Sequence, residues 1–270
     1  MKNRIEDMSI AVRGAGELAS AVIRRLAMAG FKVIALEKAE PECVRRAVCF
    51  AEAVYDGEIT IEGLTGVLAN TLDEAREISR DGRAPVVIDP DGNCIRNGGF
   101  DAVVDARMLK RGIDTIIDMA PIVIGLGPGF VVGRNCHAAV ETNRGIDLGR
   151  ALYRGSPQAD TGIPAPIEGN TVERVLRSPI DGVFRSSKKI GDQIRAGDEV
   201  GDVAGKSVSC SIGGVLRGIV RSGIFVSKNQ KIGDIDPRGV REDCFKISDK
   251  ANAVAGGALE AILFFRGRVR

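Results

Sequence analysis

A glycine-rich stretch near the amino terminus has the residue types and spacing that phosphate binding requires. The octapeptide RGAGELAS (13 to 20) places Gly14, Gly16 and Ala19 in the pattern G-x-G-x-x-(G/A). In this pattern the first glycine permits a tight turn, the second leaves backbone uncovered where a pyrophosphate approaches, and the small third residue lets helix and strand pack closely. A helix start adds N–H groups and partial positive charge. The stretch therefore predicts a nucleotide-binding turn.

A carboxylate follows at the distance that ribose recognition requires. Glu37 lies 21 residues after Gly16, and an acidic residue near this spacing accepts hydrogen bonds from the ribose hydroxyls of NAD. A 2′-phosphate would be repelled there, but the adjacent Lys38 weakens that discrimination, so NAD and NADP both stay candidates. The predicted cofactor-binding residues are Gly14, Gly16, Ala19 and Glu37.

The hydrophobic pattern indicates the elements that position these residues. Residues 8 to 12 and 31 to 37 are apolar and rich in β-branched side chains, as in strands of a parallel sheet covered on both faces. Between them, apolar residues spaced by four form one face of a helix that ends at Gly30. A strand, a helix and a strand within about 30 residues form a βαβ unit.

Strands and helices continue to alternate over residues 1 to 154. Thr71 and Glu74 form a capping box that begins a helix, and Gly82 ends it. Three more segments have the pattern of buried strands: residues 85 to 89, 102 to 106 and 121 to 125. This alternation predicts a Rossmann-like parallel sheet that binds ligands at the carboxyl ends of its strands.

Two other groups of residues in this region carry weaker chemical signals. GLGPG (125 to 129) follows a strand, and it either presents backbone N–H groups to an oxyanion or forms an ordinary turn. His137, the only histidine, lies four residues before Glu141, but two potential ligands without a third do not make a metal site. The six cysteines form no CxxC pair, so no metal site is expected.

The second part of the chain contains an internal repeat. A displacement of 32 residues aligns residues 182 to 203 with residues 214 to 235, and six of the 22 positions are identical. Both copies have short strand patterns separated by glycine turns, and each copy is too small to bury its apolar face alone. The repeat predicts two interleaved hairpin units that close into one small barrel or flattened sandwich.

One lysine between the two copies raises the question of a carrier function. Residues 174 to 236 resemble the biotinyl/lipoyl barrel-sandwich family. The segments that carry the resemblance are SPIDGVF, KKIGDQIRAGDEVGDV and GGVLRG. In that family the acceptor lysine lies at the tip of the hairpin between the halves. Lys206, in VAGKSVSC, falls beside the tip, without a flanking methionine, on a shortened hairpin. Neither biotin nor lipoate is therefore expected, and we prefer a barrel that presents a surface to a partner.

Segments from nearly the whole chain resemble the YqeB family, which is associated with selenium-dependent molybdenum hydroxylases. These segments are VRGAGELAS, RRAVCFAEAVYDG, IGLGPGF, ETNRG, TGIP, ERVLRSPIDG and KIGDIDPRG. The resemblance implies an accessory role in maturing xanthine-dehydrogenase-like enzymes that carry molybdenum cofactor and labile selenium, and a nucleotide domain similar to that of XdhC-type factors. Only the residues of the dinucleotide loop carry over, onto Gly14, Gly16, Ala19 and Glu37. The family pattern has a histidine after ETxRG, where this chain has Ile146.

Composition excludes several classes of partner. The chain has 270 residues, of which 44% are hydrophobic, 4% are aromatic and none is tryptophan. Nucleic-acid-binding surfaces combine clustered Lys and Arg with aromatic residues, so no nucleic-acid partner is expected. The sequence has no apolar run of about 18 uncharged residues and no signal-peptide pattern. We therefore expect a cytoplasmic protein without a membrane partner.

These patterns divide the chain into four parts. Residues 1–154 form the Rossmann-like nucleotide-binding domain, and the Gly- and Pro-rich residues 155–170 form a linker. Residues 171–238 form the barrel-sandwich domain, and residues 239–270 form a helical segment, capped by Ser248, that docks on the rest. The expected fold class is α/β: a Rossmann-like parallel-sheet domain, a small all-β barrel-sandwich hybrid domain and a C-terminal helix.

Three functions agree with these patterns. We favour an accessory or maturation protein for a selenium-dependent molybdenum hydroxylase, which binds a nucleotide or a nucleotide-bearing molybdenum cofactor and meets the hydroxylase or its cofactor-maturation machinery. An NAD-dependent oxidoreductase is the second, with His137 as the only histidine available for proton transfer. A carrier protein modified on Lys206 is the third. The sequence does not decide whether the protein is an enzyme.

Overall fold

Two compact units make up the chain in the computed structural model, which describes residues 4 to 109, 112 to 160, 162 and 166 to 268. The first unit consists of Met1–Pro41, Cys49–Asp160 and Ile247–Arg270, and the second consists of Glu42–Val48 and Thr161–Lys246. Nothing in the sequence pattern indicated that the short stretch from Glu42 to Val48 belongs with the barrel. Within the expected linker, residues 161 and 163 to 165 lie outside the described residues.

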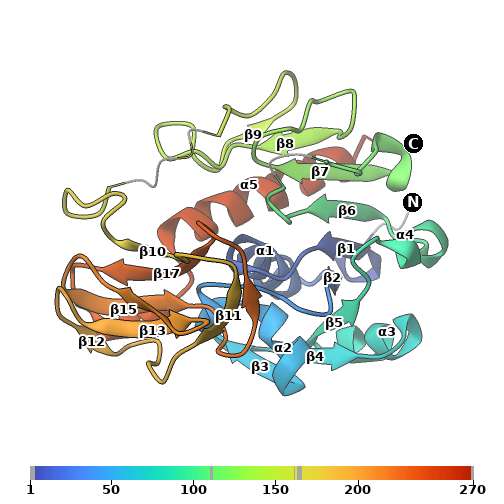
Figure 1. Ribbon diagram of the computed structural model, residues 1–270. Coiled ribbons are helices and arrows are strands. Elements are labelled where there is room, and N and C mark those ends of the chain that lie inside the picture. The colour runs from blue at the N-terminus through green and yellow to red at the C-terminus, as the bar shows by residue number, and fades with distance from the viewer. Residues whose placement is uncertain (1–3, 110–111, 161, 163–165, 269–270) are drawn as a thin grey trace. The chain divides into compact units, whose positions relative to one another are not determined.

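The first unit is built on a nine-stranded sheet (Figure 1). Its strands, in spatial order, are β3 (Glu58–Ile61), β4 (Leu64–Ala69), β5 (Ala84–Ile88), β2 (Lys32–Glu37), β1 (Ser9–Arg13), β6 (Ala102–Asp105), β7 (Ile122–Leu126), β8 (Ala138–Val140) and β9 (Ala151–Leu152). All neighbouring pairs from β4 to β8 are parallel, and the edge strands β3 and β9 are antiparallel to their neighbours. The predicted Rossmann-like parallel sheet is confirmed, with two antiparallel edges added.

The predicted elements around the glycine turn are present, with small shifts at their ends. α1 (Glu17–Met28) connects β1 to β2. α3 (Leu72–Arg80) begins as its capping pattern predicts, because the Thr71 hydroxyl accepts a hydrogen bond from the Glu74 N–H at 3.1 Å. The Glu74 carboxylate accepts from the Asn70 N–H at 2.8 Å, one residue earlier than in a regular capping box.

Several elements were not predicted, most of them because they are too short to show a hydrophobic period. They are the β3–β4 hairpin, β8, β9, α2 (Ala53–Asp56), α4 (Asn93–Gly98) and the 3₁₀ turns η1 (Ile5–Asp7), η2 (Arg46–Val48), η3 (Phe50–Glu52), η4 (Ile117–Met119) and η5 (Arg241–Phe245). The connection from β6 to β7 therefore contains η4 rather than an α-helix. β4 is as long as β2, but Thr65 and Gly66 interrupt its apolar residues.

α5 (Asp249–Arg266) packs beside α1 and against β7 within the first unit (Figure 1). Ser248 caps it: the hydroxyl accepts from a first-turn N–H at 3.2 Å and donates to the Glu17 carboxylate at 2.8 Å. A Cβ at Gly257 would lie 2.1 Å from the Gly149 carbonyl oxygen. The glycine therefore allows the helix to approach the loop after β8 closely.

The second unit consists of two four-stranded antiparallel sheets. The first has the order β10 (Val175–Arg177), β17 (Lys231–Asp236), β15 (Gly214–Ile219) and β12 (Gln193–Ile194), and the second has the order β14 (Lys206–Ser209), β13 (Glu199–Val203), β11 (Gly182–Arg185) and β16 (Phe225–Val226). The 32-residue displacement relates β10 to β14, β11 to β15, β12 to β16 and β13 to β17. Each sheet is thus the equivalent of the other.

The two copies of the repeat bond to each other reciprocally. The Gly191 N–H donates to the Leu216 carbonyl at 2.9 Å, and the equivalent Gly223 N–H donates to the Phe184 carbonyl at 2.7 Å. The two glycines have φ of +95° and +96°. The four apolar pairs of the repeat are all buried: Phe184 with Leu216, Ile194 with Val226, Val200 with Ile232, and Val203 with Ile235. The predicted all-β barrel-sandwich unit is confirmed.

Candidate functional site

The turn between β1 and α1 has a backbone shape that depends on its glycines. Gly14 has φ of +99°, a conformation that residues with a side chain rarely adopt, and its N–H donates to the Leu36 carbonyl at 2.7 Å. Gly16 is the N-cap of α1, with φ of −71°, and Ala19 is fully buried. The tight turn, the helix start and the close packing all occur here. Their role in cofactor binding stays a prediction.

This turn lies at the point where the order of the sheet reverses. From β1 the chain passes to β2 on one side, and β6 and β7 lie on the other side of β1. Ligands of open α/β sheets bind outside the carboxyl ends of the strands at such a switch point. The loops that follow β1, β2 and β6 therefore form the candidate site.

Glu37, the last residue of β2, bonds to the turn itself. One carboxylate oxygen accepts from the Ala15 N–H at 2.7 Å, and the other accepts from the Lys38 N–H at 2.9 Å. Each carboxylate oxygen has two lone pairs, so both keep capacity for a ribose hydroxyl. The structure thus brings Glu37 and the glycine turn together.

Buried hydrogen bonds from a third segment fix the shape of the turn. The Ala15 carbonyl accepts from the Ala51 N–H and from the Ser20 hydroxyl, both at 2.9 Å. The Ser20 oxygen in turn accepts from the Phe50 N–H at 2.8 Å. Because the protein holds the turn in place, little ordering cost remains when an anion binds to it.

A group of charged residues, here called the arginine cluster, lies at the carboxyl ends of β1 and β6. It consists of Arg13, Asp105, Arg107, Asp114 and Thr115. Arg13 and Asp105 are register partners on adjacent strands, and they are 1% and 2% exposed. Arg107 forms a two-pronged pair with Asp105 at 3.1 and 2.7 Å. The Thr115 hydroxyl donates to Asp105 at 2.6 Å and accepts from Arg13 at 2.7 Å.

Asp114 bridges the two arginines of the cluster. Its Oδ1 and Oδ2 accept from Nη1 and Nη2 of Arg13, both at 2.9 Å, and Oδ1 also accepts from Arg107. Burial alone would raise the pKa of Asp114, but hydrogen bonds and charge from the two guanidinium groups hold that pKa well below its usual range. The cluster borders the glycine turn, since a Cβ at Gly14 would lie 3.3 Å from Cα and Cγ of Arg107.

The arginine cluster was not predicted from the sequence, although part of its signal is present there. Arg13 and Asp105 end strands that are otherwise apolar, and a charged side chain in such a place requires a partner. Asp114 and Thr115 come from an irregular segment after β6, where no periodicity predicts a position. A search for charged residues at the ends of buried strands would have found two of its five residues, Arg13 and Asp105.

His137 and Glu141 flank β8 at opposite ends and do not form a joint site. Nδ1 of His137 accepts from the Val123 N–H at 3.0 Å. Burial lowers the pKa of His137, against an opposing effect of Asp118. Glu141 accepts, each at 2.7 Å, from three backbone N–H groups, those of Thr142, Asn143 and Gln158. His137 thus lies at the amino end of β8, three strands from β1, and not beside the glycine turn.

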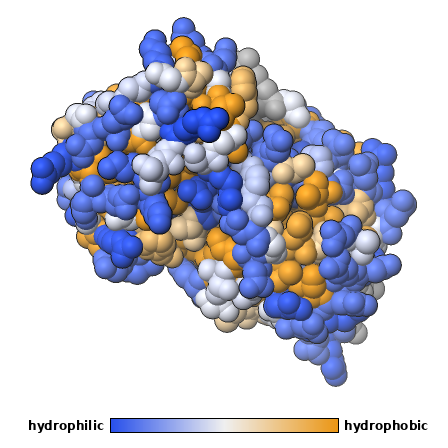
Figure 2. Space-filling view, turned by 60° about the horizontal axis from the view of Figure 1, so that its bottom comes forward, coloured by the Kyte–Doolittle hydropathy of each residue, from blue (hydrophilic) through white to orange (hydrophobic). Residues whose placement is uncertain are grey.

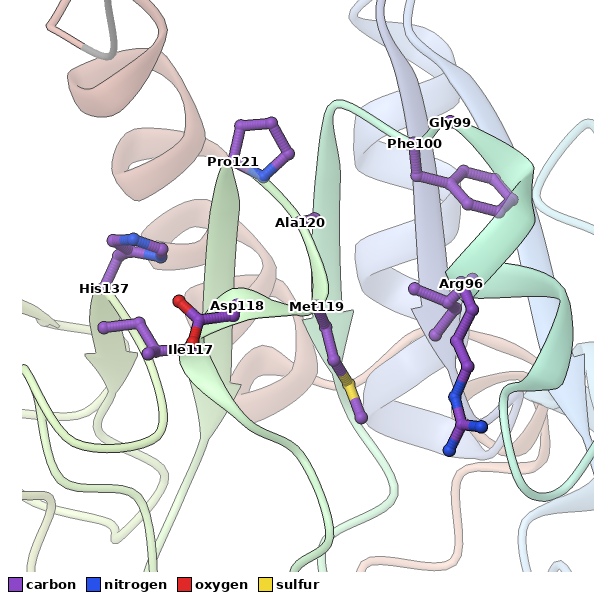
Figure 3. A pocket seen from close by; sticks show the side chains of 10 residues that line it. Arg96, Gly99, Phe100, Ile117, Asp118, Met119, Ala120, Pro121 and His137 are labelled. Carbon is purple, nitrogen blue, oxygen red and sulfur yellow. The ribbon is translucent and has the colours of Figure 1, made fainter.

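A pocket of about 460 Å³ lies beside the amino ends of β6, β7 and β8, where Phe100, Pro121 and His137 line it (Figure 3). Arg96, from α4, and Met119, from η4, complete much of its wall. The ligand rule for open α/β sheets concerns the carboxyl ends of strands. The pocket therefore lies at the opposite ends of the strands from the glycine turn, although Met119, in its wall, also approaches Arg13 Nη1 at 4.0 Å.

The second glycine turn, residues 125 to 129, is filled by the protein's own side chains. A Cβ at Gly125 would lie 2.0 Å from the ring of Phe130, and a Cβ at Gly127 would lie 2.7 Å from the Thr142 hydroxyl. The glycines here make room for packing. Of the two interpretations of GLGPG, the ordinary turn fits this geometry better.

Lys206 is the first residue of β14 and pairs with Val203 across the two-residue turn Ala204–Gly205. The turn residues have φ of +49° and +79°, as in a type I′ hairpin. The lysine therefore lies on the strand, beside the turn. In the described part of the chain no group of three or more His, Cys, Asp or Glu residues could hold a metal ion.

The hydrophobicity of the face drawn in Figure 2 adds no argument for another site. The face in Figure 2 mixes hydrophilic residues with separate hydrophobic patches. Single exposed apolar side chains such as Phe225, at 62% exposure, are common on soluble domains. No helix within the described residues is long and apolar enough to cross a bilayer.

The strand order and the glycine turn define a Rossmann-like α/β unit, which this chain combines with a barrel-sandwich unit. No family model matches the sequence. The chain is 44% identical over 254 residues to "Uncharacterized protein YqeB" of Escherichia coli (strain K12). The match covers 94% of this chain and 47% of YqeB, so the chain spans about half the length of that relative.

The solved structures that match the chain are only distantly similar to it. TcdA (CsdL) is 15% identical over 98% of this chain and 88% of that chain, with a TM-score of 0.37. Escherichia coli tRNA N6-threonylcarbamoyladenosine dehydratase, in complex with AMP, is 12% identical over 98% and 89%, with a TM-score of 0.32. An aspartoacylase family protein of Mesorhizobium loti is 14% identical over 84% of both chains, with a TM-score of 0.26. Similarities of this size support no inference about ligands.

Proposed function

We propose that this protein binds a nucleotide at the glycine turn between β1 and α1. The main support is the backbone geometry at the switch point of the sheet. Gly14 has a positive φ there, and Gly16 begins the helix that follows. The first N–H groups of a helix lack partners within the helix and attract an anion. A phosphate of the nucleotide lies against the first turn of α1.

In this proposal Glu37 recognises the ribose. Its carboxylate lies beside the turn, where it already bonds to Ala15, and it accepts from the ribose hydroxyls. NAD, NADP and a nucleotide-bearing molybdopterin all carry a ribose and a phosphate, and the site as described suits all of them. Lys38 follows directly and offers a positive charge to an additional phosphate.

We further propose that this binding serves the maturation of a selenium-dependent molybdenum hydroxylase. The support is the resemblance of sequence segments to the YqeB family, which is associated with such hydroxylases; the matching Escherichia coli protein is itself named only as uncharacterized. The partner is the hydroxylase or its cofactor-maturation machinery. In this proposal the barrel unit presents a surface to a protein partner instead of a carrier lysine, because Lys206 lies on a strand beside the hairpin turn Ala204–Gly205 and not in it.

Thermal unfolding of the full chain with added NAD, NADP, GTP, CTP or molybdopterin tests the proposal. A ligand that binds only the folded state stabilises it, by about 2.7 kcal/mol at a concentration 100 times its Kd. We expect at least one of these compounds to raise the melting temperature. Calorimetric titration then gives its Kd.

A substitution at Gly16 shows whether the binding occurs at the turn. Its φ of −71° suits any residue, and Asp and Ser are both favoured N-cap residues. Gly16→Asp should keep or raise the melting temperature but weaken nucleotide binding at least tenfold, because its carboxylate repels the phosphate. Gly16→Ser is the matched neutral control, and we expect it to lose less affinity for the nucleotide than Gly16→Asp. Unchanged affinity in Gly16→Asp would exclude a phosphate at this turn.

A further inference from the structure

The arginine cluster contains more positive charge than its buried acid can balance. Asp105 is paired with Arg107 through a fork of two hydrogen bonds. Arg13 is 1% exposed, and a buried guanidinium requires a counter-anion. Its partners other than Asp114 in the described part of the chain are uncharged: the Thr115 hydroxyl, the Asp91 carbonyl and the Met119 sulfur. Asp114 is therefore the anion that balances Arg13.

Asp114 differs from the rest of the cluster in its exposure. Its side chain is 50% exposed, whereas Arg13 and Arg107 are 1% and 17% exposed. The carboxylate thus lies on the solvent side of two guanidinium groups. Its two oxygens meet both terminal nitrogens of Arg13 at 2.9 Å, the two-pronged geometry with which arginine also holds a phosphate.

The cluster lies within reach of a ligand at the glycine turn. The stem of Arg107 passes over Gly14, as the 3.3 Å approach of its Cγ to a Cβ position there shows. A diphosphate or dinucleotide at the start of α1 therefore places its second anionic group next to Arg107. Arg13 and Arg107 together recognise two or more oxygens of one anion.

We infer that Arg13 and Arg107 form a second anion subsite, which Asp114 fills in this structure and from which a phosphate group of the ligand displaces it. This inference rests on the proposed nucleotide binding and specifies the class of ligand as one with at least two phosphate groups. The exchange replaces one anion by another, so the charge of buried Arg13 stays balanced throughout. Asp114 acts as a competitor that lowers the affinity for phosphate and rejects uncharged ligands.

Calorimetric titration of the full chain with inorganic pyrophosphate at low salt tests this exchange. Asp114→Asn keeps the size of the side chain and removes the competing charge, so we expect pyrophosphate to bind at least tenfold more tightly than to the wild type. Asp147→Asn is the matched control, because Asp147 is also an ion-paired carboxylate, at 40% exposure, on an unrelated exposed arginine, Arg150. It should bind as the wild type does.

Two outcomes would overturn the exchange. One is unchanged or weaker pyrophosphate binding in Asp114→Asn. The other is an equal gain in affinity in Asp147→Asn, which would mean that net charge alone causes the gain.

A second test uses the wild-type protein, so it does not depend on the folding of a variant. The Nε–Hε NMR signals of Arg13 and Arg107 should move together on addition of pyrophosphate, and unmoved signals at saturation would contradict the inference. Loss of nucleotide binding in Gly16→Asp tests the glycine turn separately, so failure of the exchange is distinguishable from failure of the proposed function.

Discussion

The glycine turn after β1 and the hairpin turn between β13 and β14 both carry sequence signals for a ligand, but their surroundings differ. A Cβ at Gly14 would meet Arg107 at 3.3 Å, whereas a Cβ at Gly205 would meet nothing within 4 Å. The first turn is bound to β2 and to the segment at Ala51 by hydrogen bonds. The second is held by its own hairpin, by a hydrogen bond that the Gly205 N–H donates to the Asp202 carboxylate, and by one that the Ala204 N–H donates to the Val183 carbonyl at 3.2 Å.

The glycine turn is therefore a site whose backbone is fixed by its surroundings, whereas the hairpin turn is exposed. Binding that depends on geometry needs a backbone held from several sides. The glycine turn is bonded to two other segments, at Leu36 and Ala51, by bonds of 2.7 and 2.9 Å, whereas the hairpin turn has one bond of 3.2 Å to a neighbouring strand. A carrier lysine needs the opposite, an accessible position at a tip. Lys206 lies on a strand beside such a tip, so the hairpin meets this need only in part.

Loss of Arg13 should give the largest effect. In Arg13→Met the cluster loses a buried charge that bonds to Asp114 and Thr115. Breaking a fully buried ion pair costs about 3–5 kcal/mol and losing an exposed one about 0–1 kcal/mol. Because Asp114 is half exposed and keeps its bond to Arg107, we expect a loss between these limits, of about 1–3 kcal/mol. Lys206→Met, at the hairpin, should stay within about 0.5 kcal/mol of the wild type. Urea denaturation measures both. Similar values for the two variants would remove the contrast between the regions.

Alanine in place of each glycine compares the two turns directly. Both positions have positive φ, +99° at Gly14 and +79° at Gly205, which costs an L-residue about 1–2 kcal/mol. At Gly14 the added methyl group would also push against Arg107 at 3.3 Å, whereas at Gly205 it would meet nothing within 4 Å. We therefore expect Gly14→Ala to lower the free energy of unfolding more than Gly205→Ala, and to weaken nucleotide binding, which Gly205→Ala leaves intact. The reverse order in denaturation would contradict the account.

Acid should weaken the arginine cluster, because Asp114 loses its charge as the pH falls. The folded-state pKa of Asp114 is lowered, against the opposing effect of its burial, by Arg13 and Arg107. Its contribution to stability is therefore complete above the unfolded-state pKa of about 3.9 and is lost as the pH falls toward the folded-state pKa. The stability difference between wild type and Asp114→Asn should shrink below about pH 4. A difference that grows on acidification, in urea denaturation at a series of pH values, would show the wrong sign.

The smallest effect is expected at Lys206. The intact mass of protein from its native host should show no biotinyl or lipoyl addition, and Lys206→Arg should melt at the wild-type temperature. A mass increase that Lys206→Arg abolishes would establish a carrier function and overturn our interpretation of the barrel.

The sequence predicted best those features that depend on local pattern or repetition. The spacing of Gly14, Gly16 and Glu37 predicted one βαβ unit, and β1, α1 and β2 are present with shifts of a few residues. The 32-residue displacement predicted the barrel because equivalent positions bury equivalent apolar side chains. Conformation persists even where identity is lost, since Gly197 and Asn229 are equivalent and both have positive φ.

The sequence could not predict features that depend on distant contacts. Arg13 and Asp114 are 101 positions apart, and no period relates them. The residues of Glu42–Val48 contribute to the barrel unit although the chain around them belongs to the sheet. His137 and Glu141 share a spacing that suggested a pair, yet a short strand carries them to opposite ends. Such relations arise from tertiary packing and need the folded structure.

Amide NMR during titration with a nucleotide tests the central claim most directly. The account predicts that the N–H signals of Gly14, Ala15, Gly16 and Glu17 shift first and saturate together, while those of Ala204, Gly205 and Lys206 stay in place. Shifts centred on His137 and Phe100, with an unchanged glycine turn, would instead locate the ligand in the pocket at the other edge and contradict the account.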